Sequence, residues 1–85
     1  MSFARKILST RDRALYLVHG FDITGSACWY FVKIPAAKIA AFEARIARAE
    51  PLDLSQAGDI ILSGYGSEPL DEDRQSALAM MQTTA

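Results

Sequence analysis

A base and a nucleophile are both present in this chain, since His19 is its single histidine and Cys28 its single cysteine. An imidazole that titrates near neutral pH accepts the proton of a thiol, and the resulting thiolate is a nucleophile. Catalysis also requires a group that orients the base, and none stands at a recognised spacing. Two such ligands are too few for a closed zinc site. We therefore interpret His19 as a packing residue and Cys28 as a small buried hydrophobic residue, and expect no catalytic residue, metal or cofactor.

The segment 64–67 (Gly-Tyr-Gly-Ser) lies between an expected strand and an expected helix, as phosphate-binding loops do. It lacks the lysine and the longer glycine spacing of those loops. The helix start that follows carries Glu68, Asp71, Glu72 and Asp73. A nucleotide phosphate would meet four like charges there, so we expect a solvated first turn and no phosphate or cation site. The two glycines favour a tight turn that presents or buries the ring of Tyr65.

Three aromatic residues stand in a row, Trp29, Tyr30 and Phe31, with Lys33 two positions later. A strand of this kind stacks nucleic-acid bases when it lies in a positive field. The formal net charge is −1 and the basic residues are scattered, so we predict core packing and no nucleic-acid partner. The basic residues near the N-terminus lack an apolar anchor, which predicts no membrane association.

Composition is typical of one small globular domain. The chain has 85 residues, of which 51% are hydrophobic and 22% charged, and this length is too short for a second core. No apolar run approaches the roughly 20 residues of a membrane span, and the first residues do not form a secretory signal. A single cysteine cannot form an internal disulfide, which favours a reducing compartment. We predict one cytoplasmic domain over residues 1–85, with flexible ends at 1–12 and 82–85.

Charge is distributed unevenly along the chain. Residues 1–13 carry a net +3, residues 14–49 a net +2 and residues 50–85 a net −6. Such an asymmetry marks either a basic surface for an acidic partner or two halves that attract each other within the fold. We favour the second interpretation.

A β-hairpin is predicted over residues 14–34. Two runs rich in β-branched and aromatic residues flank the segment 22–25 (Asp-Ile-Thr-Gly), which is typical of a type I turn closed by a glycine at positive φ. In the register this turn implies, Asp22 faces Ser26 and His19 faces Trp29. An alternative register would bring His19 opposite Cys28 instead.

In the first register both faces of the hairpin are apolar. One face carries Leu15, Leu17, His19, Phe21, Ala27, Trp29 and Phe31. The other carries Tyr16, Val18, Cys28, Tyr30, Val32 and Ile34. Strands with one face in water would alternate polar and apolar residues, and these do not. Each face therefore needs cover, from a helix on one side and from a second helix or another protein chain on the other.

The remaining elements predict an α+β fold in the order ββαβα, with a small antiparallel sheet of the hairpin and a third strand. A helix is expected over residues 35–49, with an apolar stripe of Ile39, Phe42 and Ile46. A third strand is expected over residues 59–63, and a second helix from Asp71. Residues 2–10 fit either a short amphipathic helix or an edge strand.

One stretch of the chain resembles a known group of proteins. The residues that carry the likeness are 27–32 (Ala-Cys-Trp-Tyr-Phe-Val), 52–54 (Leu-Asp-Leu) and 58–69, which begins Gly-Asp-Ile-Ile-Leu. Over residues 15–74 the chain resembles small bacterial proteins of unassigned function. The resemblance implies a compact bacterial cytosolic domain and transfers no catalytic residue.

Two functions fit these observations. The first is an interaction module that binds a second copy of itself through an apolar sheet face or a sheet edge. The second is a ligand-binding or catalytic domain with a pocket near His19, Trp29 and Tyr65. A third possibility is a regulatory partner of a larger complex that docks through residues 1–13. As the ligand or partner surface we predict His19, Trp29, Tyr30 and Tyr65.

Overall fold

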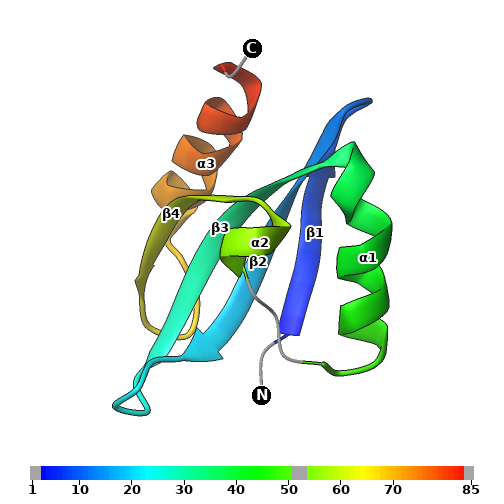
Figure 1. Ribbon diagram of the computed structural model, residues 1–85. Coiled ribbons are helices and arrows are strands. Elements are labelled where there is room, and N and C mark those ends of the chain that lie inside the picture. The colour runs from blue at the N-terminus through cyan, green and yellow to red at the C-terminus, as the bar shows by residue number, and fades with distance from the viewer. Residues whose placement is uncertain (1–2, 51–53, 84–85) are drawn as a thin grey trace.

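The computed structural model describes residues 3–50 and 54–83 and has the α+β fold that the sequence predicts. Its antiparallel sheet has the strand order β1-β2-β3-β4. The strands are β1 (Phe3–Ser9), β2 (Arg13–Phe21), β3 (Ala27–Pro35) and β4 (Asp59–Tyr65). The helices are α1 (Ala36–Ala47), α2 (Leu54–Ala57) and α3 (Asp71–Thr83). Figure 1 shows β2 and β3 inside the sheet, with β1 and β4 at its edges.

The predicted register of the β2–β3 hairpin is confirmed, with His19 opposite Trp29. Its turn has the expected chemistry: the backbone N–H of Asp22 donates to the carbonyl of Ser26 at 3.0 Å, and Gly25 has a φ of 85°. The Asp22 carboxylate also accepts the Ser26 N–H at 2.9 Å. Because the turn fixes the pairing of two long strands, it also fixes which side chains share a face.

The N-terminal segment is an edge strand rather than a helix, so the element order is βββααβα and not ββαβα. Strand β1 pairs with β2, with Ala4 opposite Val18, and its register shifts between Lys6 and Leu8. Residues 3–9 are therefore held in the sheet. Residues 1–2 and 84–85, which belong to the ends expected to be flexible, lie outside the described residues. Strand β4 extends two residues beyond the predicted 59–63, and α3 begins at Asp71 as predicted.

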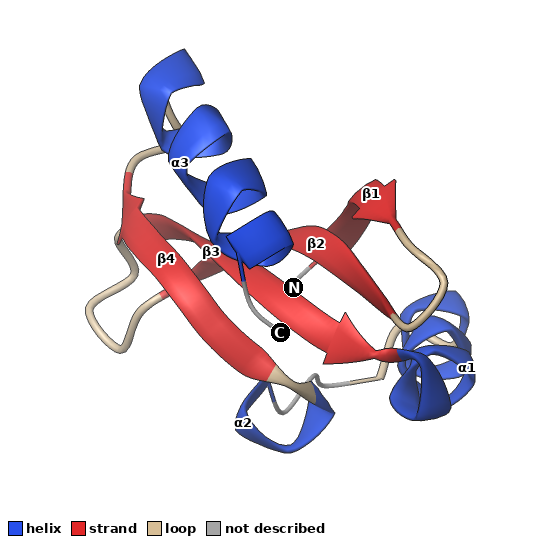
Figure 2. Cartoon of the chain, turned by 90° about the horizontal axis from the view of Figure 1, so that it is seen from above, coloured by secondary structure: helices blue, strands red, loops and turns tan. Residues whose placement is uncertain are grey.

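One face of the sheet, the α1 face, is covered by α1 and α2 (Figure 2). Helix α1 begins one residue later than predicted, at Ala36, because Pro35 is its N-cap rather than part of its first turn. The predicted stripe of α1 is confirmed, since Phe42 is buried and Ile39 and Ile46 pack beside it. The ring of Phe42 meets that of Tyr16 edge to face, with the ring centroids 4.9 Å apart. The buried residues of this cluster are Ala14, Tyr16, Val18, Val32, Ile34 and Phe42.

The opposite face, the α3 face, is covered by the C-terminal helix (Figure 2). Ala77 and Met81, which are four residues apart on α3 and so form a short apolar stripe, are fully buried. The indole of Trp29 meets the ring of Phe31 edge to face, with centroids 5.6 Å apart. The buried residues here are Leu15, Leu17, Trp29, Phe31, Ala77 and Met81. A helix of the same chain therefore supplies the second cover, and this face is not left for another protein.

A hydrogen bond under α1 makes the free energy of unfolding depend on pH in the alkaline range. The buried phenol of Tyr16 donates to the carboxylate of Glu43, and burial, followed by this bond, raises the pKa of Tyr16 above its usual value of 10.0. In this range the folded state holds the phenolic proton more tightly than the unfolded chain, so the free energy of unfolding falls as pH rises above about 10. We expect Tyr16→Phe to cost about 1 kcal/mol at neutral pH.

In the Tyr16→Phe variant the free energy of unfolding should decrease less as pH rises above about 10, because the titrating group has been removed. Urea denaturation at a series of pH values measures both effects. Tyr65→Phe is the matched control, since Tyr65 is 76% exposed and the removal of its hydroxyl leaves the packing under α1 unchanged. An unchanged alkaline slope in Tyr16→Phe would contradict this assignment.

Candidate functional site

The four residues predicted for a ligand or partner surface fall into two pairs on opposite faces. His19 and Trp29 are cross-strand neighbours on the α3 face. Tyr65 lies opposite Cys28 across β3 and β4, and it therefore shares the α1 face with Cys28 and Tyr30. The sheet separates Tyr65 from His19 and Trp29, so those three do not line one pocket.

Trp29 is a packing residue. It is only 5% exposed, and its indole lies over Gly64 of β4. A Cβ atom at Gly64 would come within 2.4 Å of Cζ2 of the indole. A side chain at that position would displace the ring, so the glycine makes the packing possible. Because Gly64 has no side chain, strand β4 leaves room for the large indole of Trp29 under α3.

His19 belongs to an ionic cluster centred on Glu68. Its Nε2 lies 3.5 Å from one carboxylate oxygen of Glu68. The other oxygen is 3.1 Å from Nη2 of Arg74 and 3.9 Å from Nη2 of Arg5. The Glu68 side chain is 54% exposed, so these pairs are screened by water and each contributes little to stability. The cluster joins β1, β2 and α3 at one end of the sheet, and it links the basic N-terminal segment to the acidic C-terminal one.

Cys28 and His19 point to opposite faces of the sheet, so they form no thiol–imidazole pair. The buried Cys28 thiol donates to the hydroxyl of Tyr30 at 3.3 Å. This hydrogen bond is the main reason that the pKa of Tyr30 is raised above its ordinary value. A thiol engaged in this way on the α1 face is placed for packing rather than for attack on a substrate.

Strand β4 is an exposed edge strand, as is β1, whose residues 4–9 are likewise all at least partly exposed. Each residue of β4 is at least partly exposed, whereas β2 is buried over most of its length. Ile60 and Tyr65 stand on the α1 face with exposed fractions of 46% and 76%. Figure 2 shows β4 at the outer edge, with α3 and α2 on opposite faces of the sheet. An edge strand also presents backbone N–H and C=O groups that have no neighbour within the sheet.

The turn after β4 presents Tyr65 to solvent rather than burying it. The backbone N–H of Gly66 donates to the carbonyl of Ala27 at 2.9 Å, which continues the pairing of β3 with β4 by one residue. Gly66 then turns the chain with a φ of 112°, a conformation that favours glycine. Of the two outcomes that the glycines of this loop permit, exposure of the ring is therefore the one observed.

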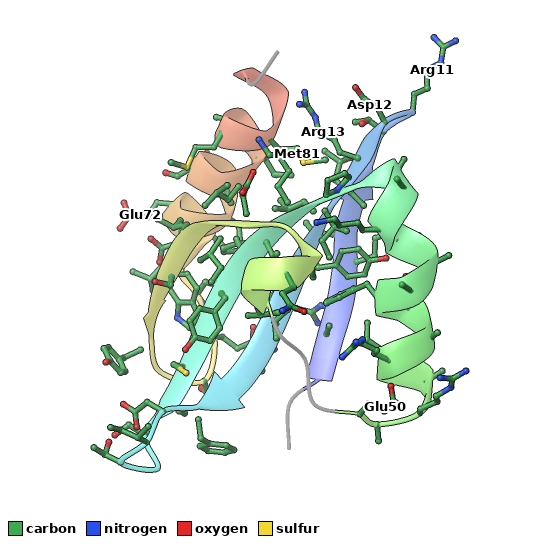
Figure 3. All side chains as sticks on the ribbon, in the orientation of Figure 1. Arg11, Asp12, Arg13, Glu50, Glu72 and Met81 are labelled. Carbon is green, nitrogen blue, oxygen red and sulfur yellow. The ribbon has the colours of Figure 1, made fainter. Side chains whose placement is uncertain are left out.

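Charge is separated in space as well as in sequence. Figure 3 shows Arg11 at the turn between β1 and β2, on the opposite side of the molecule from Glu72 of α3. The edge formed by β1 carries Arg5 and Lys6, while β4 carries only Asp59. The two edges of the sheet therefore differ in charge.

No family model, curated protein or solved structure matches this chain. In residues 3–50 and 54–83, no helix is long and apolar enough to cross a membrane. The same residues contain no cluster of three or more His, Cys, Asp or Glu side chains arranged to hold a metal ion.

Proposed function

We propose that this protein is an interaction module that forms a homodimer by pairing β4 with β4 of a second copy. The observation that carries the proposal is the exposed, nearly uncharged edge of β4. Antiparallel pairing across a two-fold axis would join the two sheets into one. The unpaired backbone groups of both edges would then be satisfied at the same time. The reduced, buried thiol of Cys28 fits a cytoplasmic location.

The two edges of the sheet differ in how well they are protected against such pairing. Proteins commonly block edge strands with charged side chains and bulges. Strand β1 carries adjacent charges at Arg5 and Lys6 and an irregularity in its register. Strand β4 also has a register irregularity, but its segment 60–67 contains no charged residue. Two β1 edges would bring like charges together, whereas two β4 edges would not, which favours β4 as the interface.

Apolar side chains beside the β4 edge would add to the interface. Ile60 and Tyr65 lie at opposite ends of the strand on the same face, with Tyr30 on the neighbouring strand. In an antiparallel pair related by a two-fold axis, Ile60 of one copy comes close to Tyr65 of the other. Aromatic and β-branched neighbours across a strand pair stabilise it by about 0.2–1 kcal/mol each. Tyr30 and Tyr65, two of the predicted surface residues, thus belong to the proposed interface.

A lysine at the centre of this edge should separate the two copies. Ser63 is exposed on β4, so Ser63→Lys leaves the core intact and places two like charges near the two-fold axis. Light scattering at high micromolar concentration should give twice the 9.3 kDa chain mass for the unmodified protein and the single mass for the variant. Mixing Ser63→Lys with Ser63→Glu should restore the double mass, because opposite charges then meet.

Ser9→Lys is the matched control, since Ser9 is an exposed serine on the other edge strand. It should leave the double mass unchanged. A single mass for the unmodified protein at high micromolar concentration would contradict the proposal. Loss of the dimer in Ser9→Lys but not in Ser63→Lys would place the interface on β1 instead.

A further inference from the structure

A cavity lies at one end of the sheet, between the tip of the β2–β3 hairpin and the loop from β4 to α3. Its volume is about 220 Å³. The residues that line it are His19, Gly20, Phe21, Ala27, Cys28, Gly66 and Ser67. Neither Trp29 nor Tyr65 is among them, so this cavity differs from the pocket that the sequence suggests.

Small residues create the space, and one aromatic ring bounds it. Gly20, Ala27 and Gly66 contribute little or no side chain. Phe21 lies on the α3 face and is 65% exposed, so its ring flanks the cavity without being buried in the core. The N–H of Gly66 bonded to the carbonyl of Ala27 holds the loop against β3. This hydrogen bond fixes the spacing between β3 and the loop, while the ring of Phe21 forms an exposed wall.

The lining of the cavity is mostly apolar and contains no Asp, Glu, Lys or Arg residue. His19 of the lining lies close to Glu68, which also lies close to Arg5 and Arg74. None of Arg5, Glu68 and Arg74 lines the cavity, so these charges pair with one another outside it. An ion inside the cavity would lose hydration without gaining a partner of opposite charge, so the chemistry favours an uncharged ligand.

The cavity is open to solvent on one side, and its volume accommodates a single ring. An apolar cavity of about 150 Å³ in another protein accommodates benzene, so the present cavity has room for a ring with one or two substituents. A flat ring can stack on Phe21. His19 and Ser67 of the lining carry polar side chains, which favours a ligand that carries one hydrogen-bonding group.

We infer that this cavity is a binding site for small uncharged aromatic molecules that carry a hydroxyl group, of which phenol is the simplest. The inference goes beyond self-association and does not depend on it, because the cavity is lined by the hairpin and the β4–α3 loop rather than by the outer edge of β4.

Titration with phenol, followed by NMR of the ¹⁵N-labelled full chain, tests the inference. Saturable shifts should be centred on residues 19–21, 27–28 and 66–67. Benzoate and benzylamine, which carry the same ring with a negative or a positive charge, should bind about tenfold more weakly or less, because either charge must be desolvated. Absence of saturation by phenol, or tighter binding of either charged probe, would overturn the inference.

Two variants locate the binding. Ala27→Leu fills the cavity and Phe21→Ala removes its aromatic wall, and each should weaken phenol binding about tenfold or more. Phe21 is largely exposed, so its variant folds even if a leucine at Ala27 is not tolerated. Ala79→Leu, on the exposed side of α3, is the control and should bind phenol normally. Unchanged affinity in Phe21→Ala would place the ligand elsewhere. Ser63→Lys should retain phenol binding, which separates this test from that of the dimer.

Discussion

Phe31→Ala is expected to remove about 3–5 kcal/mol from the free energy of unfolding. Phe31 has no exposed surface and lies at the centre of the α3 face, opposite Leu17 on β2 and in edge contact with the ring of Trp29. Truncation leaves a cavity that the paired strands cannot close. Because native proteins are stable by only about 5–15 kcal/mol, this loss is a large fraction of the total stability.

Urea denaturation followed by the fluorescence of Trp29 measures this loss, since the indole is buried beside the mutated ring. Phe21→Ala is the matched control: the same ring is removed from a position that is largely exposed, and the loss should stay below about 1 kcal/mol. Similar losses in the two variants would mean that α3 does not seal the face of the sheet on which Phe31 lies.

Gly58→Ala should be the second most damaging change. A Cβ atom at Gly58 would lie 2.1 Å from the carbonyl oxygen of Lys33 and 3.1 Å from the Cα atom of Ile34. These are backbone atoms of β3, which is paired on both sides and cannot move away. We expect a cost of about 3 kcal/mol, at the upper end of what overpacking causes.

The effect should also reach β4, because Gly58 is the residue between α2 and that strand. Hydrogen exchange should show faster exchange in β4 than in the β1–β2 pair of this variant. Gln56→Ala is the control, since Gln56 is an exposed residue of the adjacent helix α2. It should change the free energy of unfolding by no more than about 0.5 kcal/mol. A Gly58→Ala protein as stable as the unmodified one would show that α2 does not pack closely against β3.

The centre of the fold was predictable because two independent signals agree there. The turn at residues 22–25 sets the pairing, and the apolar runs on both sides are long enough to define two faces. The stripe with Phe42 in α1 and the buried Ala77 and Met81 of α3 follow from helical spacing. Which element covers the second face was not predictable, since the short stripe of α3 is no more apolar than that of a surface helix.

The edges of the sheet were harder to predict. Strand β1 contains Arg5 and Lys6, whose side chains are compatible with a helix as well as with an edge, and its pairing with β2 decides the outcome. The face on which Tyr65 lies depends on the register of β4, which shifts opposite Phe31 and Val32. Such an irregularity reverses the facing of the residues on one side of it. The division of the four predicted surface residues into two pairs therefore follows from a feature without a sequence signal.

The close contacts of glycines and the cavity at the hairpin tip depend on three-dimensional packing alone. A glycine at position 64 is typical of a turn. In the structure its missing side chain leaves room for the indole of Trp29. The cavity joins residues that are more than forty positions apart, such as His19 and Ser67. No local sequence pattern indicates that residues so far apart in the chain lie close together in the fold.

The most direct test of β4 pairing is an isotope-filtered NMR experiment on a mixture of labelled and unlabelled chains, which detects contacts between two copies only. Antiparallel pairing about a two-fold axis predicts contacts between the Ile60 side chain of one copy and the Tyr65 ring of the other, in a sample where Ser63→Lys abolishes them. Intermolecular contacts confined to β1, or none at concentrations where the mass is doubled, would contradict it.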